Sequence, residues 1–237
     1  MKRCVVVGGA DLKNTEEIKK YLREDDYFIF CDSALRHLQG LGVKADLIVG
    51  DFDSHFNPAE KWDTIREGLR SEDDIDRAEY ICRACRDSEI IVLPCEKDDT
   101  DTVYGVREGL KRGFDDFLLL GMTGQRFDHT FGNISILLWL YNEGKNAVLA
   151  DDYSQMLIVG SDPVFIDDSY AFFSLLNISG KAEKVSIKGA KYCLDGAAIS
   201  SEYQYGISNE VIEGQKAQVS VKDGKLLLVK VIKQDKW

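Results

Sequence analysis

The sequence has 237 residues and a formal net charge of −11. This length fits one large domain or two small ones, and the apolar fraction of 44% is sufficient for a sizeable core. A strongly acidic chain lacks the basic surface that attracts nucleic acids and anionic membranes, so we expect neither as a partner. The N-terminal apolar run is too short for a signal peptide, and no stretch approaches the roughly 18 apolar residues of a membrane-spanning helix. We therefore expect a soluble, cytoplasmic protein.

The first half of the chain alternates short apolar runs with helical patterns, which is typical of an α/β domain with a mainly parallel sheet. Buried strands are predicted at residues 3–7, 27–31, 47–50, 90–93, 117–120 and 147–150. Helices are expected to start at Asn14 or Thr15, near Leu35, and at Thr100 or Asp101. The highly charged segment 55–88 has apolar residues at helical spacing, which predicts one or two exposed helices.

Acidic residues follow the predicted strand 47–50 directly. Asp51 and Asp53 are separated by one phenylalanine, and an extended backbone across them would place both carboxylates on one face. At about 4 Å and an effective dielectric of about 20, two carboxylates repel by roughly 4 kcal/mol. A cation offsets such repulsion, and Mg²⁺ is commonly held by one or two carboxylates together with substrate phosphates.

Two further polar segments also follow predicted strands. Residues 96–101 carry three aspartates and a lysine, and residues 121–130 combine glycines with threonine, arginine and aspartate. In an open α/β sheet, ligands bind outside the carboxyl ends of the strands. Aspartates for a metal, with glycine, threonine, arginine and lysine for phosphates, therefore predict a nucleotide-dependent enzyme of the phosphoryl-transferase type.

The pattern changes near residues 151–160. Helical spacing gives way to short strand-like runs at residues 155–159, 164–166, 170–176, 184–187, 211–212, 217–221 and 226–232. Such runs with turn residues between them predict a sandwich or barrel. We therefore expect two domains, residues 1–152 and residues 153–237.

Several motifs of the chain are informative as a set. In the first half these are residues 46–54, residues 97–101, and residues 121–129 with Asn133. In the second half they are residues 173–176, 191–192 and 207–210. Together they resemble the motifs of the bacterial thiamine pyrophosphokinase (thiamine diphosphokinase) family. The resemblance covers nearly the whole chain in the right order, and the set is far more specific than any single motif.

This resemblance implies a Rossmann-like α/β catalytic domain that binds ATP and Mg²⁺, followed by an all-β sandwich domain that binds thiamine. It implies transfer of the pyrophosphoryl group of ATP to the thiamine hydroxyl, with AMP as the second product. It also implies a homodimer with active sites between subunits.

The resemblance also implies roles for individual residues. The catalytic and metal-binding set is Asp51, Asp53 and Asp101. The set for ATP and its phosphates is Asp32, Lys97, Asp98, Thr123 and Arg126. The set for thiamine is Asp128, Ser208 and Asn209. Which aspartate accepts the proton of the thiamine hydroxyl stays open, and Lys97 is either a phosphate contact or an ion-pair partner of the aspartates.

The chain departs from the family pattern in three places. Ser33 and Ala34 stand where two glycines are expected after Asp32, and the segment between residues 54 and 97 is longer than expected. No tryptophan lies near Ser208 and Asn209, so the sequence assigns no aromatic partner to thiamine.

Two alternatives belong to other classes. A haloacid-dehalogenase-like phosphatase also has two aspartates after a strand, but its signature usually opens the chain, whereas here a complete strand–helix–strand unit comes first. A non-catalytic protein that binds thiamine or a nucleotide has no need of three carboxylates suited to a metal.

Overall fold

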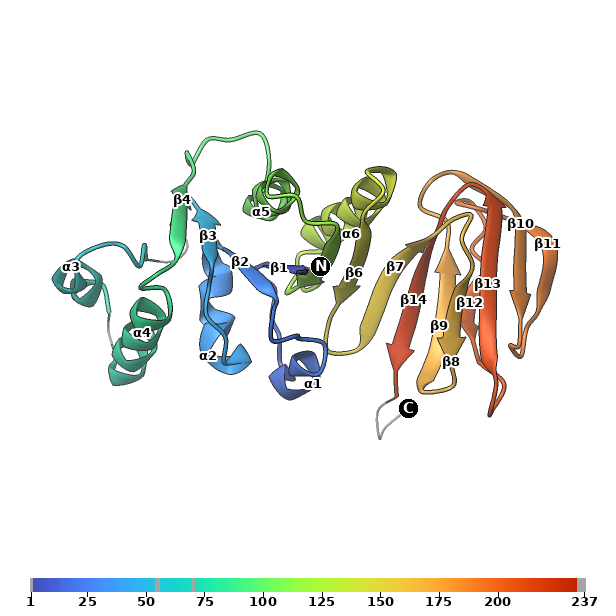
Figure 1. Cartoon of the computed structure of the whole chain (residues 1–237), viewed down its shortest axis with the longest axis horizontal. Helices are drawn as coiled ribbons and strands as arrows, with labels where there is room; N and C mark the ends of the chain where they lie inside the picture. Colours follow the sequence, from blue (N-terminus) through green and yellow to red (C-terminus); the bar gives the residue numbers. More distant parts are fainter. Residues whose placement is uncertain (1, 54–55, 70, 234–237) are drawn as a thin grey trace. The chain divides into compact units, whose positions relative to one another are not determined.

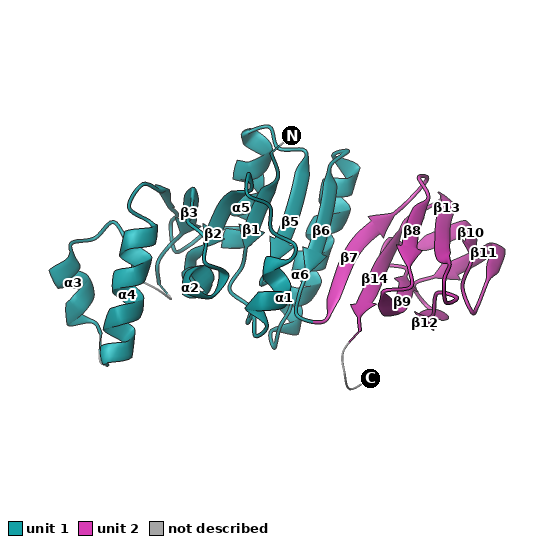
Figure 2. Cartoon of the chain, turned by 60° about the horizontal axis from the view of Figure 1, so that its bottom comes forward, with its two compact units in different colours: residues 1–152 teal, residues 153–237 magenta. Residues whose placement is uncertain are grey.

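The computed structural model describes residues 2–53, 56–69 and 71–233 (Figure 1). The chain divides into two compact units, residues 1–152 (unit 1) and residues 153–237 (unit 2), which Figure 2 shows in different colours. Ser54, the last residue of the motif at 46–54, lies outside the described residues. Within the described ranges, no helix is long and apolar enough to cross a membrane.

Unit 1 is built on a parallel sheet with the strand order β6-β5-β1-β2-β3-β4. Its strands are β1 (Cys4–Val7), β2 (Tyr27–Cys31), β3 (Leu47–Gly50), β4 (Glu89–Val92), β5 (Asp116–Leu120) and β6 (Asn146–Ala150). All six correspond to the apolar runs predicted as strands. Because all six are parallel, their carboxyl ends lie at one edge of the sheet.

Helices connect these strands: α1 (Thr15–Lys19), the 3₁₀ helix η1 (Asp32–His37), α2 (Leu38–Leu41), α3 (Trp62–Glu67), α4 (Glu72–Ala84), α5 (Asp101–Lys111) and α6 (Phe127–Asn142). Side chains cap three of them, since Asn14 accepts from the Glu17 N–H, Ser71 from the Asp74 N–H and Thr100 from the Val103 N–H. The caps at Asn14 and Thr100 fall where the sequence predicts helix starts. The charged segment 55–88 contains α3 and α4, as expected.

Both faces of the unit 1 sheet are covered. Apolar side chains of α1, α2 and α4, including Ile18, Leu38 and Ile81, form one core with the strands. Helix α5 packs against β1, β2 and β3, and α6 packs against β6. Gly105 of α5 faces the sheet closely, because a Cβ added there would lie 2.8 Å from the Sγ of Cys31. The missing side chain therefore lets α5, which begins at Asp101, approach the strand that precedes Asp32.

Unit 2 is a β-sandwich with its apolar core between two antiparallel sheets. One sheet has the order β12-β9-β14-β7, from β7 (Ser154–Val159), β9 (Tyr170–Leu176), β12 (Gly206–Asn209) and β14 (Leu226–Ile232). The other has the order β11-β10-β13-β8, from β8 (Val164–Asp167), β10 (Lys181–Lys188), β11 (Leu194–Ser200) and β13 (Lys216–Asp223). An α/β unit followed by an all-β sandwich is the expected fold.

Two details of unit 2 differ from the prediction. Strands β11 and β12 were not predicted, because both lie at sheet edges and carry mainly small or exposed residues. The strand predicted at residues 211–212 is wrong, since Val211 forms only an isolated bridge with Ala190. Val211 packs against the core without continuing a strand, whereas Ile212 is exposed.

Candidate active site

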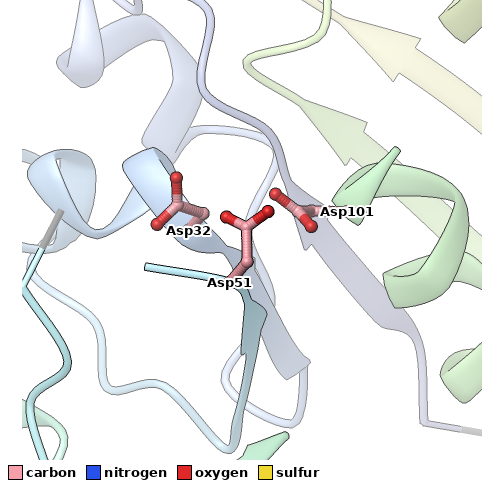
Figure 3. A group of neighbouring side chains, drawn as sticks. All are labelled: Asp32, Asp51 and Asp101. Atoms are coloured by element: carbon pink, nitrogen blue, oxygen red, sulfur yellow. The ribbon is translucent and has the colours of Figure 1, made fainter. Parts of the chain in front are cut away.

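Three carboxylates meet at the carboxyl edge of the unit 1 sheet. Asp32 follows β2, Asp51 follows β3, and Asp101 begins α5. A carboxylate oxygen from each lies within 4.8 Å of one from each of the others, and Figure 3 shows the three side chains next to one another, with those of Asp51 and Asp101 facing each other. We call these residues the carboxylate trio. Carboxylate oxygens are the donors that Mg²⁺ prefers in proteins.

Two residues in or next to the trio have unusual backbone conformations. Asp32 has φ = 41° and Phe52 has φ = 57°, a left-handed region that residues other than glycine seldom adopt. The turn at Phe52 means that Asp51 and Asp53 do not share one face through an extended backbone, which corrects that expectation. Such strain persists where the surroundings enforce it, and it is concentrated at functional sites.

Lys97 lies against two members of the trio. Its ammonium group donates a hydrogen bond to Asp51 and lies 3.1 Å from Oδ1 of Asp101. The side chains of Lys97 and Asp51 are 10% and 7% exposed, so water screens this pair little. Of the two roles considered for Lys97, the structure shows the ion pair with the aspartates.

These contacts shift the pKa values of the three groups in different directions. The hydrogen bond from Lys97 holds the pKa of Asp51 below its usual value. Burial raises the pKa of Asp101, and Lys97 only partly opposes this shift. Burial lowers the pKa of Lys97, but its two carboxylate partners outweigh burial and raise it overall.

The charge of the trio suits a divalent cation. Three carboxylates and one ammonium group leave two formal negative charges in a largely buried site. Asp32 is only 4% exposed, and burying like charges together is costly unless a cation offsets them. The donor set and its charge therefore fit Mg²⁺, with Asp32, Asp51 and Asp101 as the residues that could hold it.

The other predicted residues of this segment lie around the trio. Asp53 lies outside it, and its N–H is 3.5 Å from Oδ1 of Asp51. Asp98 is exposed in the loop before α5. Asp32, predicted as an ATP contact, lies inside the trio, so the structure groups the carboxylates differently from the predicted set of Asp51, Asp53 and Asp101.

A second polar group lies after β5 and β6. The hydroxyl of Thr123 donates to Oδ2 of Asp151 at 2.8 Å. Sequence reasoning missed Asp151, although its position directly after a predicted strand is the same signal that singled out Asp51. Because Asp151 directs the Thr123 hydroxyl, the oxygen of that hydroxyl remains able to face a ligand as an acceptor.

Arg126 and Asp128 form an exposed bidentate pair at the start of α6. The two hydrogen bonds measure 3.0 and 2.6 Å. The Arg126 guanidinium holds the pKa of Asp128 well below its usual value. Both side chains are more than 60% exposed, so the pair is accessible to a ligand and contributes little to stability.

The predicted thiamine residues of unit 2 lie near an exposed aromatic ring. Ser208 has φ = 57°, and its N–H donates to Oγ of Ser174 at 3.0 Å. The Asn209 side chain is buried and joins to both backbone groups of Tyr192, accepting from its N–H at 3.0 Å and donating to its carbonyl at 2.7 Å. Asn209 therefore fixes the backbone of Tyr192, whose side chain is 60% exposed.

A parallel α/β sheet with a carboxylate trio at its carboxyl edge is typical of a metal-dependent enzyme that acts on phosphate compounds. Comparison with known proteins is more specific. Residues 18–149 match the family described as "Thiamin pyrophosphokinase, catalytic domain", and residues 165–226 match "Thiamin pyrophosphokinase, vitamin B1 binding domain". The chain belongs to the thiamin pyrophosphokinase family, so it is an enzyme of the thiamine diphosphokinase class.

Individual relatives agree with this assignment. Thiamine pyrophosphokinase of Bacillus subtilis is 26% identical over 232 residues, covering 97% of this chain and 99% of the relative. The crystal structure of the Bacillus subtilis protein has a TM-score of 0.80 at 22% identity and covers 98% of this chain and 100% of that one. The crystal structure of yeast thiamin pyrophosphokinase has a TM-score of 0.72 at 16% identity, and the match covers 99% of this chain and 87% of the yeast chain. These structures share the fold, and neither alternative class is favoured.

Proposed function

We propose that this chain transfers the pyrophosphoryl group of ATP to the hydroxyl of thiamine, with the carboxylate trio as its catalytic centre. The observation that carries the proposal is the trio of Asp32, Asp51 and Asp101, of which Asp32 is buried and the others are half-buried, at the carboxyl edge of a thiamin pyrophosphokinase catalytic domain. In this reaction the thiamine oxygen bonds to the β-phosphorus of ATP, and the bond from that phosphorus to the AMP oxygen breaks. The hydroxyl proton goes to a base, and AMP leaves with the electron pair.

The trio is the proposed Mg²⁺ site. Mg²⁺ held by these carboxylates supplies positive charge beside the phosphates of ATP. Lys97 provides a second positive charge at the same place, since it already contacts Asp51 and Asp101. Arg126 offers a planar, two-donor contact that suits phosphate oxygens, and Thr123 and exposed Asp98 complete the proposed nucleotide residues.

Asp53 is the proposed base among the three residues predicted as catalytic. Asp51 and Asp101 belong to the trio, so their oxygens would hold the cation. Asp53 lies beside Asp51, with its N–H 3.5 Å from Oδ1 of Asp51, and a carboxylate at this place is close enough to the proposed cation site to accept the proton of the attacking hydroxyl.

Residues 153–237 are the proposed thiamine-binding domain, with residues 1–152 as the ATP-binding domain. Tyr192 is the aromatic partner of thiamine that the sequence did not assign. Its exposed ring lies near a cation in the structure, because Lys191 Nζ is 5.8 Å from the ring centroid. An aromatic face that accepts an ammonium group also suits the cationic thiazolium ring. Ser208 and Asn209 support this ring, and Asp128 of unit 1 keeps its proposed role as a thiamine-binding residue.

We also propose a cytoplasmic homodimer with active sites between subunits. Each unit exposes aromatic side chains of the kind that interfaces cover, with Phe127 and Phe131 in unit 1 and Tyr203 and Tyr205 in unit 2. Sedimentation equilibrium tests this: a mass of twice 26.7 kDa supports the dimer, and 26.7 kDa at assay concentration contradicts it.

Product analysis tests the reaction itself. The protein is mixed with ATP, Mg²⁺ and thiamine, and the products are separated by ion-exchange chromatography. Thiamine diphosphate and AMP in equal amounts support pyrophosphoryl transfer. Free phosphate formed without any need for thiamine supports a phosphatase instead, and saturable thiamine binding without turnover supports a non-catalytic binder.

A further inference from the structure

Ser33 places a hydroxyl group directly against the glycine turn that follows β1. Ser33 comes two residues after β2, and Gly9 comes two residues after β1, its parallel neighbour in the sheet. A Cβ added to Gly9 would lie 2.1 Å from Oγ of Ser33. The hydroxyl therefore occupies the space beside the bare backbone of Gly9, at the same sheet edge as Asp32.

The glycine turn is fixed on both sides of Gly9. The N–H of Gly8 donates to the Leu120 carbonyl, and the N–H of Ala10 donates to the Gly121 carbonyl, both at 2.8 Å. Arg36 donates to the carbonyl of Gly9 and pairs with Asp11 at 3.2 Å. These contacts hold the turn in place on both sides of the Gly9 N–H.

Two donors in this fixed arrangement lack an acceptor. Among the described residues, neither the Gly9 N–H nor the Ser33 hydroxyl makes a hydrogen bond within the chain, although both residues are half-buried. Half-buried donors are normally satisfied by protein, water or a ligand. Two adjacent donors of this kind form a small site for an anionic oxygen, as backbone N–H groups do in other phosphate sites.

The neighbouring carboxylates limit which anion fits. Asp32 directly precedes Ser33, so a bare anion bound here would meet the negative charge of the trio. A nucleotide phosphate that brings its own divalent cation avoids this repulsion. We propose that the Ser33 hydroxyl and the Gly9 N–H together bind a phosphate oxygen of the metal–ATP complex, an inference that rests on the proposed function. Ser33 thus contributes a hydrogen bond at a position where the resemblance led us to expect a glycine.

Ser33→Ala tests the hydrogen bond, because it removes the hydroxyl and keeps the Cβ. Ser33→Thr keeps the hydroxyl, and Ser161→Ala is the matched control, since Ser161 is exposed in the turn between β7 and β8 of unit 2. Because a hydrogen bond to a charged group contributes substantially to the free energy of binding, Ser33→Ala should raise the KM for ATP about 10-fold or more. The KM for thiamine should stay unchanged, and Ser33→Thr should restore most of the loss.

Calorimetry with Mg²⁺ and α,β-methylene-ATP, in which the reacting bond is blocked, gives a second readout that does not depend on turnover. A Kd that rises about 10-fold for Ser33→Ala, but not for Ser161→Ala, supports the inference. An unchanged Kd, or a rise in the KM for thiamine alone, overturns it. If the wild-type protein binds the analogue but forms no thiamine diphosphate, the proposed function fails, and the calorimetric comparison still decides the role of Ser33.

Discussion

Gly50 and Asp32 pack so closely that a Cβ added to Gly50 would lie 2.8 Å from the Cβ of Asp32. The same added atom would lie 3.0 Å from the Cα of Asp32, so backbone as well as side chain limits the space. This contact joins the end of β3 to the residue after β2. It therefore sets the distance between Asp51, which follows Gly50, and Asp32 in the carboxylate trio.

Gly50→Ala should displace Asp32 and disturb the trio. Because a rigid backbone must move, we expect the free energy of unfolding to fall by about 1–3 kcal/mol and kcat to fall by a larger factor than stability alone explains. Thermal unfolding and steady-state kinetics measure the two effects. Gly68→Ala is the control, since its added Cβ meets nothing closer than 3.5 Å. Full activity of Gly50→Ala would show that this contact does not position Asp32.

Gly105→Ala should push α5, and with it Asp101, away from the sheet. The added Cβ would lie 2.8 Å from the Cys31 Sγ and 3.2 Å from a methyl group of Val6. We expect a loss of about 1–3 kcal/mol in stability and a weaker affinity for the metal. Gly132→Ala provides the comparison within α6, where nothing lies within 4 Å of the added Cβ. Gly132→Ala should gain up to about 1 kcal/mol in stability from helix propensity. If Gly105→Ala gained stability as well, α5 would not be closely packed against the sheet at that position.

Lys97→Met should destabilise the protein in the absence of metal. Removing the ammonium group leaves the carboxylates of Asp51 and Asp101 without their cation in a largely buried site, which costs about 3–5 kcal/mol. Added Mg²⁺ should restore much of this loss, because the cation takes over the neutralising role. Thermal unfolding with and without Mg²⁺ measures the effect, with Lys111→Met, whose side chain is 76% exposed, as the control. Equal melting temperatures for both variants without metal would contradict the electrostatic role of Lys97.

Asp53→Asn and Asp51→Asn should separate proton transfer from metal binding. If Asp53 is the base, its variant should lose about 100-fold or more in kcat while its Mg²⁺ affinity stays near that of the wild type. Asp51→Asn should weaken Mg²⁺ binding itself, since Asp51 belongs to the trio. Metal titrations followed by calorimetry, together with kcat, give both quantities. Loss of metal affinity in Asp53→Asn would move Asp53 into the metal site.

His37 should make the protein less stable at mildly acidic pH. Its ring is 7% exposed with Nε2 2.9 Å from the Ala10 carbonyl, and burial followed by the charge of Arg36 lowers its pKa. The unfolded chain therefore binds a proton more readily than the folded one. The contribution of His37 to the free energy of unfolding is fully present above about pH 6.5. As the pH falls from there toward the pKa of the folded state, this contribution is lost at a rate of at most about 1.4 kcal/mol per pH unit.

Denaturant unfolding between pH 7.5 and 5 measures this slope. Other groups add their own pH dependence, so the informative quantity is the difference between the wild type and His37→Gln. The variant should show a shallower loss of stability on acidification. Identical slopes for the two proteins would mean that His37 titrates alike in the folded and unfolded states.

Most strands, and the edge at which the site lies, follow from the sequence. Apolar runs such as those before Gly8, Asp32 and Asp51 form parallel strands because their side chains are buried on both faces. Since the polar residues come directly after these runs, parallel topology alone places them at one edge. Edge strands β11 and β12 carry no comparable signal, because only one side of each pairs and many of their residues face solvent.

The membership of the trio did not follow from the sequence. Asp51 and Asp53 look equivalent in sequence, but the positive φ of Phe52 turns the chain between them, and Asp32 also has a positive φ. Phenylalanine normally avoids this conformation, and aspartate adopts it too rarely for the residue type alone to predict it. Residues 191–192 belong to a recognised motif, but the sequence did not assign Tyr192 to thiamine, because its connection to the predicted residues runs through the buried side chain of Asn209, 17 residues away.

Anomalous diffraction from crystals grown with Mn²⁺ and α,β-methylene-ATP tests the carboxylate trio most directly. Mn²⁺ prefers the same oxygen ligands as Mg²⁺ and can be located by its own scattering. We predict one anomalous peak within about 2.0–2.3 Å of carboxylate oxygens from Asp32, Asp51 and Asp101, with the phosphates of the analogue beside it. A peak held by other residues, or nucleotide bound with no metal between these three side chains, would contradict the proposed catalytic centre.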